Sequence, residues 1–305
     1  MLAAAAALVW HFRVDLLRSL PVPGVVGPHA RYAAALRTSG LDDTELGRGW
    51  LAAADAALEG AQTTRAGLRH AGVFTAAAPR AAAWRFPARR GQRVVVTADA
   101  SGGELFLDLL EAYGRNVVAS ATAGTAPLAY DVRQDGEFLL RAQAELLRSV
   151  DYAVAPRTEA SLEFPLSRVS PRAAHGPFGT PRDGGRRRHE GIDIFAPRGT
   201  PAVAAVDGWV TGAATNRLGG NVVWLWSPTR GIALYYAHLD RHAVTRGDRV
   251  AAGDVVGYVG TTGNARGTPP HLHFGVYARG EGAIDPAPYV IDPPDARATP
   301  RAARR

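Results

Sequence analysis

The sequence contains no cysteine and no lysine, and it has a single methionine. The absence of cysteine excludes disulfide bonds, thiol catalysis and cysteine-ligated zinc, so a metal site must use histidine and carboxylate side chains. All 35 basic residues are arginine, and the formal net charge is +7. This charge favours anionic partners such as nucleic acid, anionic lipid or an anionic cell wall, whereas the exclusive use of arginine equally indicates a coding bias. Charge alone therefore identifies no partner.

The first 28 residues form an apolar N-terminus followed by a linker. The apolar run Leu2–Phe12 is too short to span a bilayer as a helix, which needs about 20 residues. No basic residue precedes it and no clear cleavage site follows it, so a signal sequence, an anchor and a docked helix all stay open. Segment Pro21–Pro28 is predicted to be a linker from its proline and glycine content.

Residues 29–72 are predicted to be helical. Asp42 or Asp43 can cap a helix whose apolar residues recur every four positions and make one apolar face. These apolar residues are Leu46, Trp50, Ala54 and Leu58.

Residues 73–160 change to a period of two, which predicts an antiparallel β-sandwich. Trp84 and Phe86 alternate around Arg85, and Val94–Val96 is a β-branched run. The stretches WRFPARRGQRVVVTA and LAYDVRQDGEFLLRA resemble the pre-peptidase accessory domains of secreted bacterial peptidases. That resemblance implies either substrate or wall binding or a spacer role.

Residues 161–292 are predicted to form a compact antiparallel β domain without a long helix, so the fold class is mainly β. Short apolar runs alternate with glycine-containing turns. The runs are Pro201–Ala205, Trp209–Thr211, Val222–Trp226, Ala233–Ala237, Val255–Val259 and Leu272–Tyr277. Residues 293–305 read as a polar, arginine-rich tail.

Four of the nine histidines fall in short motifs of this last domain. The motifs are His189-Glu190-Gly191-Ile192-Asp193, then His238 after an apolar run, then His271-Leu272-His273-Phe274. A catalytic zinc site uses three nitrogen or oxygen ligands at about 2 Å and leaves one position for water. The motifs contain enough ligands of the right type for such a site.

The spacing of these residues constrains how they can meet. On a strand, His271 and His273 point to the same side, roughly 7 Å apart. His189 and Asp193 would lie about 13 Å apart on an extended chain, so the chain must bend between them, and Gly191 allows a bend. The sequence is not the helical His-Glu-x-x-His signature, because Asp stands at 193 and Gly191 disfavours a helix. Glu190 is therefore interpreted as a solvated flanking residue.

The region from Phe178 to Tyr289 resembles the lysostaphin/LytM-type metallopeptidases, family M23. The resemblance rests on H-x-G-x-D, a middle histidine after paired tyrosines, and H-L-H-F, in the family's order and spacing. It implies that His189, Asp193 and His273 bind Zn²⁺ and that His238 and His271 are catalytic. It also implies a compact antiparallel β fold with a groove.

Three further assignments concern residues outside these motifs. Asn221 is a candidate substrate-binding residue, because the family often has a polar residue there, although Gly219-Gly220 equally predicts a plain hairpin turn. His175 and His242 are interpreted as surface or loop histidines. Segment Ser167–His175 is placed where the family often carries a residue that blocks the zinc in a latent form.

The leading hypothesis is a zinc-dependent endopeptidase that cuts peptide bonds in bacterial peptidoglycan, within the cell envelope, either periplasmic or secreted. Expected partners are peptidoglycan peptides, with anionic wall polymers as a second candidate; nucleic acid is not expected, and membrane association is left open. Two alternatives remain: a non-enzymatic module that binds the wall or activates a hydrolase, and a zinc peptidase that acts on glycine-rich proteins.

Overall fold

The structure is a computed structural model that describes residues 27–78 and 80–294. These residues form two compact units: the first comprises the described residues up to 89, 93–159 and 294, and the second comprises 90–92 and 160–293. The apolar run Leu2–Phe12, most of the predicted linker and most of the predicted tail lie outside the described residues. No helix in the described part of the chain is long and apolar enough to cross a membrane. The predicted fold class, mainly β with short N-terminal helices, is confirmed.

The first unit begins with two helices, α2 (Pro28–Thr38) and α3 (Glu45–Glu59). The predicted cap of the second helix is wrong: Thr44 caps it by accepting from the Gly47 amide at 3.1 Å. Asp42 and Asp43 instead belong to a preceding 3₁₀ turn, η1 (Leu41–Asp43).

The apolar face of α3 is shifted by one residue from the prediction at its first turn. Trp50, Ala54 and Leu58 are buried as expected, whereas Leu46 is 40% exposed. Gly47 is buried in its place, and a Cβ there would lie 1.9 Å from the Leu41 carbonyl oxygen. The helix start therefore packs against the 3₁₀ turn so closely that only glycine fits.

Two sheets make up the rest of the first unit. One has the order β1-β3-β8-β5-β6 and the other the order β2-β9-β4-β7. Their strands are β1 (Gln62–Thr63), β2 (His70–Phe74), β3 (Ala81–Ala88), β4 (Gln92–Ser101), β5 (Leu105–Glu111), β6 (Val117–Thr122), β7 (Leu128–Asp131), β8 (Gly136–Ala144) and β9 (Val150–Ala160). Alternate residues of both sheets, such as Val94 and Leu107, share one apolar core. Segments 29–72 and 73–160, predicted separately, belong to this one unit apart from residues 90–92 and 160.

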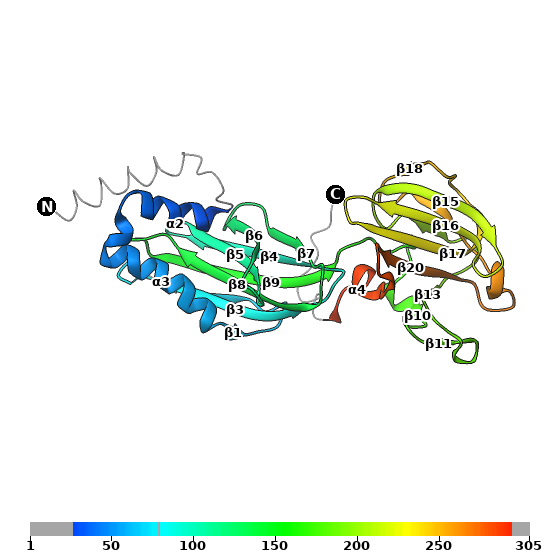
Figure 1. Ribbon diagram of the computed structural model, residues 1–305, viewed down its shortest axis with the longest axis horizontal. Coiled ribbons are helices and arrows are strands. Elements are labelled where there is room, and N and C mark those ends of the chain that lie inside the picture. Colours follow the sequence, from blue (N-terminus) through cyan, green and yellow to red (C-terminus); the bar gives the residue numbers. More distant parts are fainter. Residues whose placement is uncertain (1–26, 79, 295–305) are drawn as a thin grey trace. The chain divides into compact units, whose positions relative to one another are not determined.

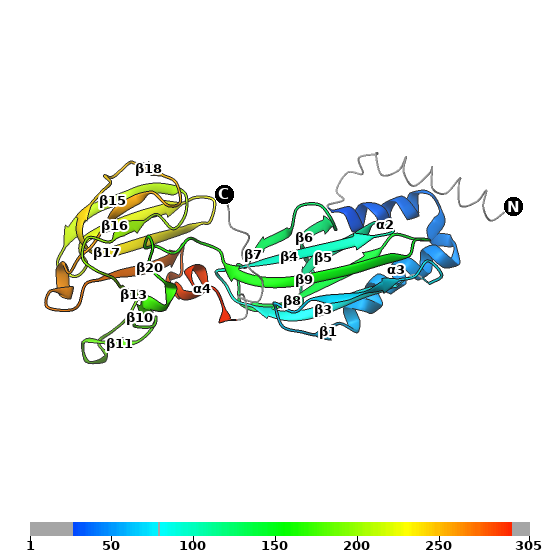
Figure 2. The same ribbon diagram turned by 180° about the vertical axis from the view of Figure 1, so that it is seen from behind.

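The helices cover the outer face of the five-stranded sheet, as Figures 1 and 2 show from opposite sides. Strand β5 is consequently buried on both faces, although its sequence suggests simple alternation. Phe106 points away from the inter-sheet core and packs on Tyr32, with ring centroids 4.9 Å apart, and on Trp50. A second, smaller core therefore lies between helices and sheet.

A buried polar network crosses this helix–sheet interface. Arg141 donates to Asp108, which also accepts from Ser120. His29 lies between Arg141 and Gln143, at 3.0 Å from the Arg141 Nη2 and 2.7 Å from the Gln143 Oε1. Because Asp108 is only 3% exposed, these partners offset the free energy cost of burying its side chain.

We expect Asp108→Ala to lower the free energy of unfolding of the first unit by about 3–5 kcal/mol, because it leaves a buried arginine unpaired. The matched control is Asp131→Ala, which removes the partner of Arg93 from a pair whose side chains are 34% and 41% exposed. Asp131→Ala should lower the free energy of unfolding by less than about 1 kcal/mol. Urea unfolding with hydrogen exchange of β5 and β8 peptides would measure both, and equal losses would contradict the prediction.

The second unit is built on a ten-stranded sheet with the main order β10-β13-β20-β17-β16-β15-β18. Its strands are β10 (Ala174–His175), β13 (Ile192–Phe195), β14 (Pro201–Val203), β15 (Gly208–Asn216), β16 (Gly220–Ser227), β17 (Ile232–His242), β18 (Arg249–Val250), β19 (Val255–Val259), β20 (His271–Ala278) and β21 (Gly282–Ile284). A separate hairpin consists of β11 (Pro181–Arg182) and β12 (Arg187–Arg188). The one α-helix among residues 160–293, α4, is short (Ala287–Val290). The apolar runs predicted from sequence lie at these strands, and the predicted lack of a long helix is confirmed for the described residues.

Three adjacent strands define the face that matters for function. In their register, Asp193 on β13 lies opposite His273 on β20, which lies opposite Ala237 on β17. The alternating residues on the other face, such as Tyr236 and Phe274, enter the core. Residues distant in sequence are thus aligned across the middle of the sheet on its polar face.

Candidate metal centre and active site

Three predicted ligands converge on the polar face of the sheet. The His189 Nε2 lies 3.0 Å from the Asp193 Oδ1 and 2.9 Å from the His273 Nδ1. The His273 Nδ1 lies 3.1 Å from the same Asp193 oxygen. These residues form a cluster of two nitrogens and one oxygen that could hold a metal ion.

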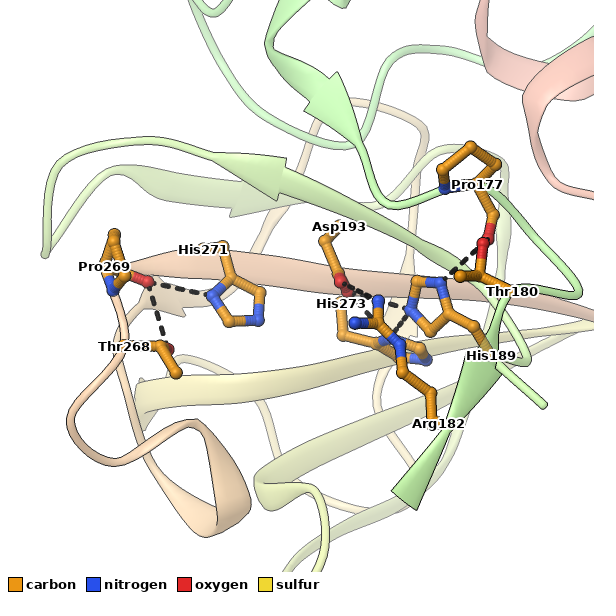
Figure 3. Close-up of polar contacts among 9 residues, drawn as sticks. All are labelled: Pro177, Thr180, Arg182, His189, Asp193, Thr268, Pro269, His271 and His273. Atoms are coloured by element: carbon orange, nitrogen blue, oxygen red, sulfur yellow. Dashed lines mark hydrogen bonds and ion pairs between the residues drawn. The ribbon is translucent and has the colours of Figure 1, made fainter. Parts of the chain in front are cut away.

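The chemistry of this set fits a cation better than a hydrogen-bond network. The Pro177 carbonyl lies 3.2 Å from the His189 Nδ1, and since a carbonyl can only accept, Nδ1 carries the proton (Figure 3). A neutral His189 then turns an unprotonated Nε2 toward the Asp193 carboxylate, which is also an acceptor. A metal ion resolves this conflict, and two imidazole nitrogens with one carboxylate are a ligand set that zinc uses.

The electrostatics of Asp193 favour its charged form. Burial alone would raise the pKa of this carboxyl, but the His189 and His273 imidazoles beside it outweigh burial and hold the pKa well below its ordinary value. Burial also lowers the pKa of His273. Both residues are therefore in the protonation state that a metal ligand needs at neutral pH.

Gly191 positions His189 by close packing. A Cβ at this residue would lie 2.5 Å from the Phe274 carbonyl oxygen and 2.7 Å from the His273 Nε2. The chain between His189 and β13 can thus pass directly beside β20. The predicted bend is present at this position, and only a residue without a side chain can make the approach.

His238 reaches the same face through a β-bulge. On either side of the bulge, Asn221 of β16 pairs with Leu239 of β17 and Val223 pairs with Tyr236. Between these pairs, β16 has one residue, Val222, whereas β17 has two, Ala237 and His238. His238 has a φ of 62°, a left-handed conformation that is costly for a residue with a side chain. Without the bulge, His238 would face the core, since neighbouring strand residues point to opposite sides.

His238 and His271 form a second pair beside the metal cluster. Their ring centroids are 5.0 Å apart, and the His238 ring lies 5.9 Å from that of His273. The His238 Nδ1 donates to the Thr262 carbonyl at 3.0 Å, and the His271 Nδ1 donates to the Pro269 carbonyl at 2.9 Å. In the neutral form of either ring, the proton is therefore on Nδ1 and the Nε2 can accept a hydrogen bond.

All five residues line one cavity of about 390 Å³. Its other walls contain mostly small or apolar residues, among them Leu218, Gly219, Ala237 and Ala265. Two arginines, Arg182 and Arg187, also line it. Sequence reasoning missed both, because they lie in an arginine-rich stretch in which nothing distinguishes one arginine from the next.

Asn221 has its side-chain amide engaged within the fold. Its Nδ2 donates to the Asp240 carbonyl at 2.9 Å, and its Oδ1 accepts from Thr215 at 2.7 Å. Among the described residues, those that line the cavity do not include Asn221. Its substrate-binding role stays a prediction that this geometry does not favour.

The remaining residues singled out from the sequence lie around the site. Glu190 accepts from the Tyr277 hydroxyl at 3.1 Å and is exposed. His175 is exposed on β10, paired through its backbone with Asp193. His242 is half-buried at the end of β17. Within the described chain, segment Ser167–His175 adds no ligand to the metal cluster, and its latency role stays a prediction.

Residues 187–286, within the second unit, match the model of peptidase family M23. The resemblance deduced from the motifs is confirmed for this part of the chain. The DD-carboxypeptidase/endopeptidase Mpg of Neisseria meningitidis is 36% identical over 117 residues, which are 38% of this chain and 26% of that protein. The L-Ala–D-Glu endopeptidase of Bacillus subtilis is 36% identical over 138 residues, 42% of each chain.

Among solved structures, the catalytic domain of lysostaphin from Staphylococcus simulans is 32% identical, with a TM-score of 0.35, and the match covers 38% of this chain and 90% of that one. This chain spans 26% and 42% of the length of the two curated relatives named above. The five residues His189, Asp193, His238, His271 and His273 all fall within the family match.

We expect the wild type to bind about one zinc ion per chain, and His273→Ala to bind less than about a tenth of that, because two ligands cannot hold the ion tightly. The control is His175→Ala, which removes an exposed imidazole outside the cluster. Metal analysis after gel filtration in a weak chelator would test this. Equal zinc in wild type and His273→Ala would show that this cluster is not the site.

The environment of His238 predicts a pH-dependent stability. Burial lowers the pKa of His238 to about 4, and the charges of His271 and His273 add to the shift. The unfolded chain, with a pKa near 6.5, binds a proton between about pH 6.5 and pH 4 that the folded state does not. Stability is therefore complete above this window and falls as the pH falls through it.

We expect His238→Gln to reduce this acid sensitivity, because glutamine can donate to the Thr262 carbonyl without titrating. The Tm of the metal-free wild type should fall more between pH 7 and pH 5 than the Tm of the variant. Scanning calorimetry at both pH values would measure the difference. If the Tm of both proteins depended on pH to the same extent, titration of His238 would not be the cause of the acid sensitivity.

Proposed function

We propose that the protein is a zinc-dependent endopeptidase that hydrolyses peptide bonds in bacterial peptidoglycan, working in the cell envelope as a periplasmic or secreted protein. The observation that carries this proposal is the meeting of His189, Asp193 and His273 at one point, with His238 and His271 in the same cavity. The family match and the printed activities of the relatives support it.

The residues of the chain divide into two roles in this proposal. His189, Asp193 and His273 would hold zinc, which when bound lowers the pKa of a water molecule and polarises the scissile carbonyl. His238 and His271 each offer an unprotonated Nε2 that can accept a proton from the attacking water. Once protonated, the same nitrogen can donate to the developing oxyanion or to the departing amine.

The cavity walls favour peptides with small side chains. A Cβ on Gly219 would lie 2.1 Å from the Tyr235 hydroxyl, so only glycine fits at this point of the lining. Ala237 and Ala265 contribute only methyl groups to the lining. Peptides that contain alanine or glycine fit such a surface, which agrees with wall peptides as substrate and also leaves glycine-rich proteins as an alternative.

We expect His238→Ala and His271→Ala each to retain zinc but to lose at least about 100-fold in the rate of hydrolysis, because proton transfer contributes 10²–10⁴-fold. Purified peptidoglycan would be the substrate, with turbidity and mass spectrometry of released peptides as readouts. His175→Ala serves as control and should retain the rate.

Two results would count against the proposal. Zinc-loaded wild type that cleaves a glycine-rich soluble protein but no peptidoglycan would favour the alternative substrate. The non-enzymatic binding module would be favoured if the wild type binds peptidoglycan, with or without zinc, but releases no new amine from peptidoglycan or from the glycine-rich protein.

A further inference from the structure

Two arginines occupy directly opposite positions on the β11–β12 hairpin beside the metal cluster. Arg182 and Arg187 are register partners in this antiparallel pair, and both line the cavity. Residues opposed in this way have Cβ atoms about 4.5–5.5 Å apart, and like charges placed there destabilise the pair. The hairpin thus brings two positive charges together at the cavity wall, at a local cost in stability.

Neither arginine is fully used by the fold. Arg182 donates through Nη2 to the Asp193 Oδ2 at 2.8 Å, as Figure 3 shows. Arg187 donates through Nε to Asp183 on the turn of the hairpin. A guanidinium carries five N–H donors, and within residues 27–78 and 80–294 these two groups have no other hydrogen-bond partner. Donors of both side chains therefore remain for a ligand.

The charge balance of the cavity specifies the sign of that ligand. Asp193 is the one acidic residue of the lining, and its Oδ1 already belongs to the metal cluster. Arg182 and Arg187 each pair with one carboxylate, Asp193 and Asp183 respectively, so a bound metal ion would leave this part of the cavity with excess positive charge. A planar guanidinium fork matches the two oxygens of a carboxylate, so a carboxylate is the group that satisfies both charge and geometry.

We propose that Arg182 and Arg187 form a subsite that binds a carboxylate of the peptide substrate close to the scissile bond. The proposal rests on the peptidase function and narrows its substrate class to peptides that carry a free carboxylate near the point of cleavage. Arg182 contacts the ligand Asp193 directly, so it ties the subsite to the metal cluster. Arg187 contacts no metal ligand and can be tested alone.

The first experiment measures binding without hydrolysis. Full-length protein carrying His271→Ala would be titrated with N-acetyl-tetraalanine as the free acid and as the C-terminal amide. We expect the acid to bind about 10- to 100-fold more tightly than the amide, the range for a hydrogen bond between charged groups. Adding Arg187→Gln should remove most of this preference. The matched control Arg188→Gln changes the neighbouring hairpin residue, which donates to the Gly179 carbonyl and lies outside the cavity lining, and it should leave the preference intact.

A second experiment follows hydrolysis. Each carboxylate within two residues of the bond cleaved in peptidoglycan would be replaced by a carboxamide in synthetic peptides. For one of these peptides, the carboxamide should raise the KM of the wild type about 10- to 100-fold. The KM of Arg187→Gln should change little, because the carboxamide in the peptide and the substitution in the protein remove the same interaction.

The outcomes separate the subsite from the peptidase function. Equal binding of acid and amide, or the same preference in Arg187→Gln, would overturn the carboxylate subsite even if peptidoglycan is cleaved. A preference that Arg187→Gln removes would establish the subsite even if no hydrolysis is found, in which case only the peptidase function fails.

Discussion

The site depends on the register of three strands, β13, β20 and β17. The Asp193–His273–Ala237 alignment is held by backbone hydrogen bonds, so the distance between the metal-ligating side chains is set by the spacing of the sheet. A slip of one residue in β20 would send His273 into the core and Phe274 into the cavity. The buried partners of the same strands, Tyr236 and Phe274 among them, resist such a slip, so the apolar core on one face fixes the chemistry on the other.

The bulge at Ala237–His238 lets two consecutive residues face the cavity, which a regular strand does not allow. Regular alternation would place only one of these two neighbours on the polar face. The left-handed backbone of His238 places both at the cavity, at a conformational cost that the rest of the sheet must offset. A buried imidazole with a lowered pKa beside two other histidines is a further cost, which is a common feature of sites selected for activity rather than for stability.

The sequence was informative where a short motif or a simple period carries the structure. Period-two runs located the strands of the second unit, and the motifs around His189, His238 and His271 contained the residues that converge. The cap of α3 was missed because Asp42, Asp43 and Thr44 are all good capping residues in succession, and only packing against Leu41 selects among them. The burial of β5 on both faces cannot be predicted from periodicity, because periodicity does not reveal that helices cover the second face.

The arginines of the cavity illustrate a different limit. Arg182 and Arg187 become neighbours only through the pairing of a hairpin with very short strands, for which the sequence provides no periodic signal. Asn221 shows the opposite case: a polar residue in a family-like position whose amide groups serve the turn and strands around it. Motif spacing finds residues that bind a common ion, whereas the partners of individual polar side chains depend on tertiary contacts.

Three main-chain carbonyls, those of Pro177, Thr262 and Pro269, accept the Nδ1 protons of His189, His238 and His271. The main chain therefore holds the Nδ1 proton of each of these imidazoles. Substitutions at residues 177, 262 and 269 can therefore accumulate without changing which nitrogen each imidazole presents, provided that the loops keep their backbone path. The protonation pattern of the site is consequently encoded in the course of the chain, and sequence identity at the carbonyl-bearing positions is a poor guide to whether a relative preserves it.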